Sequence, residues 1–292
     1  MVPSMETPAI RFSPHPFPDL TARITETLGV TPIDYPERYA AIRAGRKEGA
    51  QAAGVLLLIR MEGHTPFLQL IKRSAMVAQP GDLSCPGGML HGATDVAFRS
   101  LLCSGAMPVI QGRPRELSRL RGPLEYRLIC LFLANALRET WEELGLNPMR
   151  IRFLGPLPTY SLILFRRTIF PLMGMVSAPW TFRPNREVAR VVEIPLASFF
   201  AEESYGRYIV TYTEVSGSKE EVCQDFPCMI HREPDGTEEI LWGATFYIIM
   251  RMLKIVFDFD LPDWRKGRPI ERSLRADYLT GQRMAGRIPP AD

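Results

Sequence analysis

The chain has 292 residues, of which 46% are hydrophobic and 23% are charged, and its formal net charge at pH 7 is +3. This length can bury a substantial core, and the composition is ordinary for a soluble globular protein. No apolar run approaches the roughly 20 residues that span a bilayer, and the proline-interrupted N-terminus lacks the features of a secretory signal, which argues against a membrane protein and makes the cytoplasm the expected location.

Breaks in the pattern divide the chain into a main domain and its additions. We assign residues 1–50 to an N-terminal extension and residues 51–260 to the main domain. Residues from about 96 to 122 have no clear period and separate two segments that belong together, so they are predicted to be an insertion. Residues 261–292 are rich in Arg and Lys and are predicted to be a solvated basic tail. Because no interleaved aromatic residues accompany this tail, no nucleic-acid partner is expected.

The main domain begins with the signals of a sheet. A helix is predicted around Pro36–Lys47, and two strands, Ala52–Arg60 and Pro66–Lys72, are separated by a short turn that predicts a hairpin. The next segment, QPGDLSCPGGML, contains glycines at which the backbone can bend tightly and approach a ligand closely. We therefore expect a functional loop here, with the glycines Gly81, Gly87 and Gly88.

A long helix is predicted after the insertion. Pro123 suits the first turn of a helix, residues 124–144 run without Gly or Pro, and Gly145 supplies a C-terminal stop. Further strands separated by turns are expected downstream, followed by an amphipathic helix at Leu241–Phe257. These strands are Ile151–Leu157, Thr168–Val176, Glu187–Ile194 and Tyr208–Tyr212.

Carboxylates gather on one side of the long helix. At 3.6 residues per turn, Glu139, Glu142 and Glu143 span roughly 100° opposite an apolar stripe. Such carboxylates repel one another by roughly 0.2–0.5 kcal/mol per pair, so the cluster is mildly unfavourable without a cation. Oxygen ligands of this kind suit Mg²⁺ or Mn²⁺. A lone Glu pair would indicate a solvent-facing helix, but Arg138 can steer a carboxylate and a glycine turn lies upstream, which favours a metal and phosphate site.

The same helix carries a motif. The segment Arg138–Leu146, RETWEELGL, resembles the core of the Nudix box, R-E-U-x-E-E-x-G-U, and Gly88 resembles the opening glycine of that box. The family pattern separates this glycine and arginine by x5-E-x7, whereas here they stand 138 minus 88, or 50, positions apart. The box is therefore split by an insertion of some 35 residues. Asp95 stands one position later than the early acidic residue of the pattern.

Other segments resemble the coenzyme A diphosphatase branch of the family. LQLIKRS followed by GDLSCPGG is similar to its signature, and GPLPTYS, FPLMGMV, NREVARVVEIPL and ILWGATFYIIMRML follow in the order found in that branch. Two departures concern the substrate. Cys85 replaces the expected Phe, and no Arg stands between Ser74 and Gly81.

The resemblance implies a Nudix fold, an α/β/α sandwich with a mixed β-sheet. It implies a hydrolase that uses Mg²⁺ or Mn²⁺ to cleave a pyrophosphate bond in a nucleoside diphosphate derivative, first of all coenzyme A or an acyl-CoA. The general base is left open between Glu142 and Glu187, and Arg138 orients the carboxylates. The metal ligands implied are Glu139, Glu142 and Glu143, and the substrate-binding residues are Arg73, Gly87 and Gly88, although Arg73 could equally pair with an acidic neighbour.

Several alternatives remain open. The enzyme could act on ADP-ribose or a dinucleotide, or the chain could be a non-catalytic Nudix regulator that binds a nucleotide. Tyr160 and Phe165 are candidates for a nucleotide contact, whereas a loop role is expected for His91 and a core role for Trp242. A homodimer is possible because dimers are common in the family. Apolar residues of the insertion could contact a membrane or a partner, but such residues more often pack on their own domain.

Overall fold

The protein is described by a computed structural model that covers residues 19–45, 49–162, 166–177, 180–213, 221–274 and 278. Its first sheet contains β1 (Gln51–Glu62), β2 (Thr65–Arg73), β3 (Leu83–Ser84), β4 (Gly87–Met89), β5 (Ile151–Pro156), β6 (Tyr160–Leu162), β7 (Arg167–Val176) and β8 (Val188–Pro195). The strand order is β3-β2-β1-β7-β5, while β4 pairs with β1, β6 with β7 and β8 with β2. The sheet is mixed because β1 runs parallel to β7 and antiparallel to β2 and β4.

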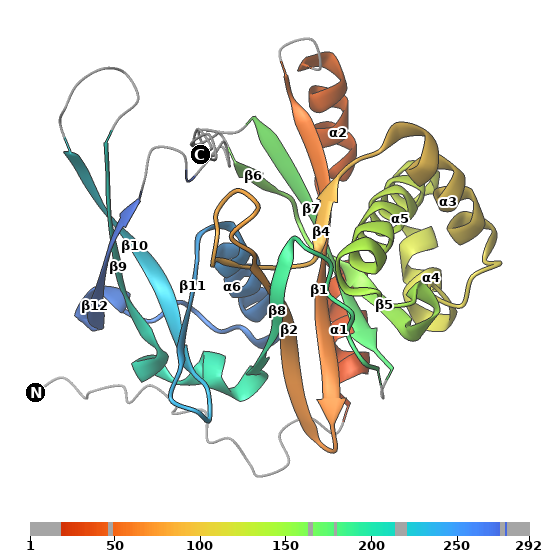
Figure 1. Ribbon diagram of the computed structural model, residues 1–292. Coiled ribbons are helices and arrows are strands. Elements are labelled where there is room, and N and C mark those ends of the chain that lie inside the picture. Colours follow the sequence, from red (N-terminus) through yellow and green to blue (C-terminus); the bar gives the residue numbers. More distant parts are fainter. Residues whose placement is uncertain are drawn as a thin grey trace, which may run out of the picture.

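Helices cover both faces of this sheet (Figure 1). They are α1 (Leu20–Val30), α2 (Tyr35–Ala44), α3 (Gly92–Ser104), α4 (Gly112–Leu120), α5 (Pro123–Leu144) and α6 (Gly243–Phe257). On one face, α1 and α6 bury apolar side chains against strand residues such as Leu57 and Met173. On the other face, α2, α3 and α5 pack against residues such as Leu56 and Phe170. The predicted α/β/α sandwich with a mixed sheet is confirmed.

A second sheet lies beside the sandwich. It has the order β11-β10-β9-β12 and consists of β9 (Tyr205–Thr213), β10 (Glu221–Arg232), β11 (Glu238–Trp242) and β12 (Arg268–Leu274). Tyr208, Val210 and Cys228 form its own apolar cluster. Ion pairs join the two sheets, because the buried Glu239 of β11 accepts hydrogen bonds from Lys72 at 2.7 Å and Arg190 at 2.6 Å.

Most elements of the main domain agree with the prediction. The hairpin is confirmed, with Glu62 opposite Thr65 across its turn, and α5 matches the predicted helix at both ends. The last helix was predicted from Leu241 and is wrong there. Leu241 and Trp242 extend β11 and pair with β10, so α6 begins only at Gly243.

The additions to the main domain also form regular structure. Helices α1 and α2 contribute buried side chains to the two faces of the sandwich, and the basic segment contributes β12, which pairs in parallel with β9. The predicted insertion forms most of α3 and all of α4. Its Leu102, Val109 and Ile110 are fully buried, so these apolar residues pack on their own domain. Among the helices of the described residues, none combines the length and hydropathy needed to cross a bilayer.

Candidate active site at the glycine turn

The glycine turn lies directly against the acidic helix. Strand β4 pairs with β1, with Gly87 opposite Val55 and Gly88 opposite Gly54. Gly87 has φ 147°, and a Cβ there would meet the Gly54 carbonyl oxygen at 2.3 Å. A Cβ on Gly88 would lie 2.5–2.7 Å from the carboxylate atoms of Glu139. A side chain at Gly87 would therefore clash with the backbone of β1, and one at Gly88 would displace the Glu139 carboxylate.

Glu143 is the most deeply placed carboxylate of the site. Its side chain accepts a hydrogen bond from the Gly87 amide at 3.0 Å, and the residue is 7% exposed. Burial raises the pKa of Glu143 to about 8, although the Gly87 amide favours the ionised form. Burial also raises the pKa of Glu139, and Arg138 opposes that shift. A bound divalent cation would stabilise both ionised carboxylates, so the electrostatics of these residues suit a metal.

Arg138 lies at the centre of the carboxylates. Its guanidinium donates to Asp95 at 2.7 Å, to Glu139 at 2.9 Å and to Glu142 at 3.0 Å. The arginine side chain is 13% exposed, whereas Glu142 is 55% exposed and extends toward solvent. Arg138 therefore orients two of the three predicted metal ligands through its planar set of donors.

Asp95 supports Arg138 from α3. It is fully buried in the first turn of α3, and its Oδ2 accepts from the His91 amide at 2.7 Å and from the Asn135 amide group at 3.0 Å. The other carboxylate oxygen receives the 2.7 Å bond from Arg138. Asp95 is therefore a partner of Arg138, and the His91 side chain remains exposed on the adjoining loop.

Glu187 and Arg73 lie at the rim of the same site. Glu187 is exposed at the start of β8, and its charge contributes to the raised pKa of Glu143. Arg73 ends β2, and its charge acts on Glu143 in the opposite direction. Its Nε donates to the Ala78 carbonyl at 2.7 Å. The predicted acidic pairing of Arg73 does not occur among the described residues, since no carboxylate there lies within ion-pair distance of it.

The remaining candidates make contacts of other kinds. Tyr160 stacks on Tyr247 of α6 with ring centroids 5.9 Å apart, and Phe165 lies outside the described residues. Trp242 packs against Tyr208 and Phe226 in the second sheet, with centroid distances of 4.7 Å and 5.6 Å. Trp242 therefore has the core role that was expected, although it belongs to the core of the second sheet.

The predicted metal ligands are near one another but do not form a preassembled cage. Within the described ranges, no group of at least three His, Cys, Asp or Glu side chains has a geometry that could hold an ion. Arg138 explains this, because it binds Glu139 and Glu142, while Glu143 turns toward Gly87. The donors are all hard oxygens, and the Glu143 carboxylate is buried in a place that disfavours its ionised form, so the residue set fits Mg²⁺ or Mn²⁺.

A tether to the glycine loop was not visible in the sequence. Arg272 of β12 donates to Asp82 at 3.0 Å and to the Pro80 carbonyl at 3.1 Å. The hydroxyl of Tyr278 also donates to Asp82, and the Tyr278 carbonyl accepts from the Gln79 amide at 2.9 Å. These contacts join residues about 190 positions apart, and no local sequence signal could have indicated them.

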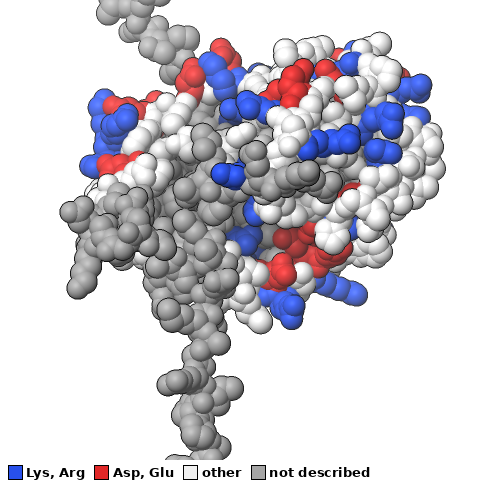
Figure 2. All heavy atoms as spheres, turned by 90° about the horizontal axis from the view of Figure 1, so that it is seen from above, with Lys and Arg blue, Asp and Glu red and all other residues white. Residues whose placement is uncertain are grey.

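Figure 2 views the edge of the first sheet at which β1 and β7 begin. Acidic side chains form a cluster on this face, and basic side chains lie around it, so the described surface shown there has mixed charge.

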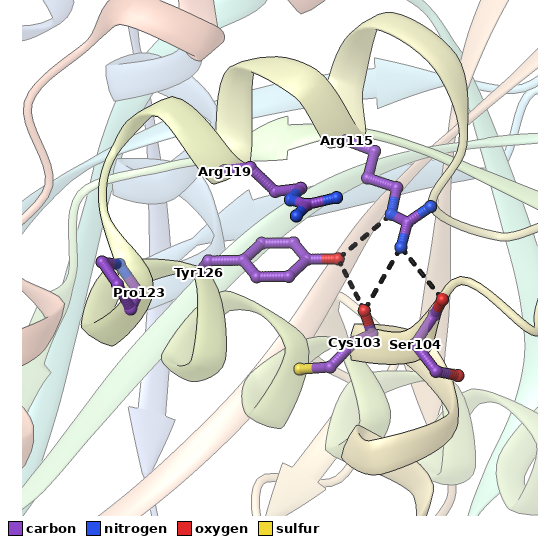
Figure 3. Close-up of a pocket in the computed structure, with 6 residues that line it drawn as sticks. All are labelled: Cys103, Ser104, Arg115, Arg119, Pro123 and Tyr126. Carbon is purple, nitrogen blue, oxygen red and sulfur yellow. Dashed lines mark hydrogen bonds between the residues drawn. The ribbon is translucent and has the colours of Figure 1, made fainter.

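A pocket of about 520 Å³ lies elsewhere, between α3, α4 and the start of α5 (Figure 3). Its Tyr126 is 13 residues before Glu139, or about 20 Å along the helix. Arg115 fills part of it by donating to the Cys103 and Ser104 carbonyls.

Comparison with known proteins agrees with this geometry. No family model matches the chain. It is 37% identical over 144 residues to an uncharacterised Nudix hydrolase, NudL, from Pectobacterium atrosepticum, and the match covers 48% of this chain. Over this segment the chain is similar to a Nudix hydrolase. The match covers 56% of the relative, so the chain spans about half the length of that protein.

Solved Nudix structures overlap with the chain only in part. A C. elegans Ap4A hydrolase is 12% identical and covers 51% of this chain and 82% of its own, with a TM-score of 0.32. The NUDIX domain of Shewanella oneidensis NrtR, solved with ADP ribose, is 13% identical and covers 56% and 83%, with a TM-score of 0.33. A MutT/nudix protein from Enterococcus faecalis is 12% identical and covers 78% and 76%, with a TM-score of 0.38.

Proposed function

We propose that this protein is a Nudix hydrolase that cleaves a pyrophosphate bond in a nucleoside diphosphate derivative with the help of Mg²⁺ or Mn²⁺. The observation that carries the proposal is the contact between the Gly87 amide and the buried Glu143 carboxylate, beside Glu139 and the Arg138 guanidinium. A purely structural helix would gain nothing from burying an acid whose ionisation is disfavoured there. In a site that binds a cation and a phosphate, the buried carboxylate is favourable, because the cation stabilises its ionised form and so offsets the free-energy cost of burial.

Each residue has a distinct part in this mechanism. Glu139, Glu142 and Glu143 would hold the metal, which when bound neutralises the pyrophosphate and acidifies a water molecule. Arg138 keeps Glu139 and Glu142 in place, and the absence of a side chain at Gly88 leaves room for substrate oxygens beside Glu139.

The general base is assigned to Glu142 in this proposal. Its Oε2 accepts from Arg138, so Oε1 is the atom that would accept the proton of the attacking water. Glu187 is the alternative base, because its charge also acts on Glu143.

Coenzyme A or an acyl-CoA is the proposed substrate. The support is the order of the sequence segments that resemble the coenzyme A diphosphatase branch, from the strand that ends at Arg73 to α6. ADP-ribose and dinucleotides are the competing substrates. Cytoplasmic location and a homodimer remain predictions.

Hydrolysis of coenzyme A, ADP-ribose and Ap4A should be measured with Mg²⁺ and with Mn²⁺. We expect coenzyme A to be cleaved with the highest kcat/KM, and Glu142→Gln and Glu143→Gln to lose activity by about 100-fold or more. Glu202→Gln, at an exposed residue outside the site, is the matched control and should retain activity. Preference for another substrate would refute the coenzyme A assignment, and metal-independent nucleotide binding without any turnover would favour the regulator.

A further inference from the structure

Arg167 begins β7 at the same edge of the sheet as the glycine turn. Gly54 of β1 pairs with Gly88 on one side and with Phe170 of β7 on the other. Arg167 is three residues before Phe170, so its backbone lies about 10 Å further along the strand. This position is toward the edge seen in Figure 2, where basic side chains flank the acidic cluster.

The guanidinium of Arg167 makes few hydrogen bonds for a group that is partly buried. Its Nε is buried and has no hydrogen-bond partner. Its Nη2 donates to the Gln51 side-chain oxygen at 3.5 Å, which is the limit for such a bond. Burial is the main factor that lowers the pKa of Arg167, and among the described groups no acid opposes this shift. A half-buried guanidinium without an acidic partner is unfavourable unless an anion is bound.

Arg73 is a second cation within electrostatic reach. Its positive charge adds to the lowering of the Arg167 pKa, and the same charge acts on Glu143. Strand β2 ends at Arg73 and β7 begins at Arg167 at the same edge of the sheet, on either side of β1. Its Nε is occupied by the Ala78 carbonyl, and its terminal nitrogens have no acidic partner among the described residues. Two like charges thus lie at one edge of the sheet, where a bound phosphate would reduce the repulsion between them.

We propose that Arg167 and Arg73 form an anion subsite that binds the phosphate group of the substrate facing away from the acidic helix. This inference rests on the proposed function, and it adds Arg167 as a residue that determines affinity for the phosphorylated part of the substrate. The Nε of Arg167 and the terminal nitrogens of Arg73 donate to the phosphate oxygens. The ligand class is therefore a phosphate ester or phosphoric anhydride, and a neutral nucleoside does not bind there.

Calorimetric titration with inorganic pyrophosphate tests the subsite without turnover. The full chain is used with a chelator present, so that binding does not require a metal. We expect Arg167→Met and Arg73→Met each to weaken pyrophosphate binding by about tenfold or more, which corresponds to about 1.4 kcal/mol. Arg167→Lys should bind with intermediate affinity, since it keeps the charge but loses the planar donors. Arg152→Met, at an exposed residue of β5, is the matched control and should bind like the wild type.

The outcomes separate the subsite from the catalytic proposal. If Arg167→Met binds pyrophosphate as tightly as the wild type, the subsite is overturned whether or not the protein is an enzyme. If binding depends on Arg167 but no substrate is hydrolysed, the subsite stands and the proposed activity fails. Thermal unfolding of each variant shows whether it is folded. If Arg167→Met does not fold, the pyrophosphate affinity of a folded Arg167→Lys tests the subsite instead. In an active protein, we expect Arg167→Lys to raise KM more than it lowers kcat.

Discussion

Replacing Asp95 should show whether α3 supports the acidic helix α5. Asp95 is fully buried, and Asp95→Ala removes the acceptors for Arg138, for the His91 amide and for Asn135. Removing one partner of a buried ion pair typically destabilises a protein by about 3–5 kcal/mol. Because Glu139 and Glu142 still bind Arg138, we expect the lower end, about 3 kcal/mol.

The loss of Asp95 should reduce the hydrolytic activity of the protein as well as its stability. A native protein has about 5–15 kcal/mol of stability, so Asp95→Ala should still fold. Without Asp95, the positive charge of Arg138 is shared by Glu139 and Glu142 alone, and both become weaker ligands for a cation. We therefore expect weaker Mn²⁺ binding and lower hydrolytic activity together. Asp95→Asn keeps the shape and should lose less stability, about 1.5–3 kcal/mol, which is typical of one hydrogen bond to a charged group.

Urea unfolding followed by circular dichroism measures the loss of stability, and Mn²⁺ titration measures the metal affinity. Asp225→Ala is the control, because Asp225 pairs with Arg207 on the second sheet and both side chains are 37% exposed. An exposed pair contributes at most about 1 kcal/mol. If Asp95→Ala destabilises the protein no more than Asp225→Ala does, Asp95 does not support Arg138 in the way argued above.

Three further changes test other parts of the structure. Gly88→Ala places a methyl group against the Glu139 carboxylate and should lower kcat/KM by on the order of 100-fold with the circular dichroism unchanged, whereas Gly92→Ala, with open space around it, should remain active. Arg272→Met removes the tether to Asp82. It should speed hydrogen exchange of the backbone amides at residues 79–82 and lower the free energy of unfolding by about 1–3 kcal/mol. Unchanged exchange would contradict the tether. Burial lowers the pKa of His231 below the ordinary 6.5, so the unfolded chain binds a proton that the native protein resists, and stability should fall as the pH drops through 6.5. Urea unfolding at pH 5.5 and 7.5 should show a smaller difference for His231→Gln, and an equal difference would refute this assignment.

Elements with strong local signals could be predicted from the sequence. The helix from Pro123 to Gly145 has a suitable first residue, no interruption and a left-handed terminal glycine with φ 62°. The start of α6 could not be predicted, because Leu241 and Trp242 are recruited by β10 and this pairing is non-local. Helix α1 was missed for a related reason, since the burial of its Leu28 depends on contact with distant parts of the chain.

The sequence also indicated which carboxylates gather, but not what holds them. The helical period placed Glu139 and Glu143 on one side, and the structure brings both against the glycine turn. The period could not show that Arg138 also binds a residue from α3. Arg167 carried no signal at all, because its character depends on an unpartnered Nε and on the neighbouring Arg73, and both are consequences of strand pairing.

The split between Gly88 and Arg138 has little effect on the geometry, because buried contacts replace continuity of the chain. Asn135 is fully buried in α5, and its oxygen accepts from the Gly54 amide at 2.7 Å. Its amide group donates to the Met89 carbonyl at 2.9 Å and to Asp95 at 3.0 Å. One side chain thus joins β1, β4 and α3 to the acidic helix. An insertion can lengthen the chain between β4 and α5 without moving the catalytic groups, provided that it leaves Asp95 and Asn135 in contact.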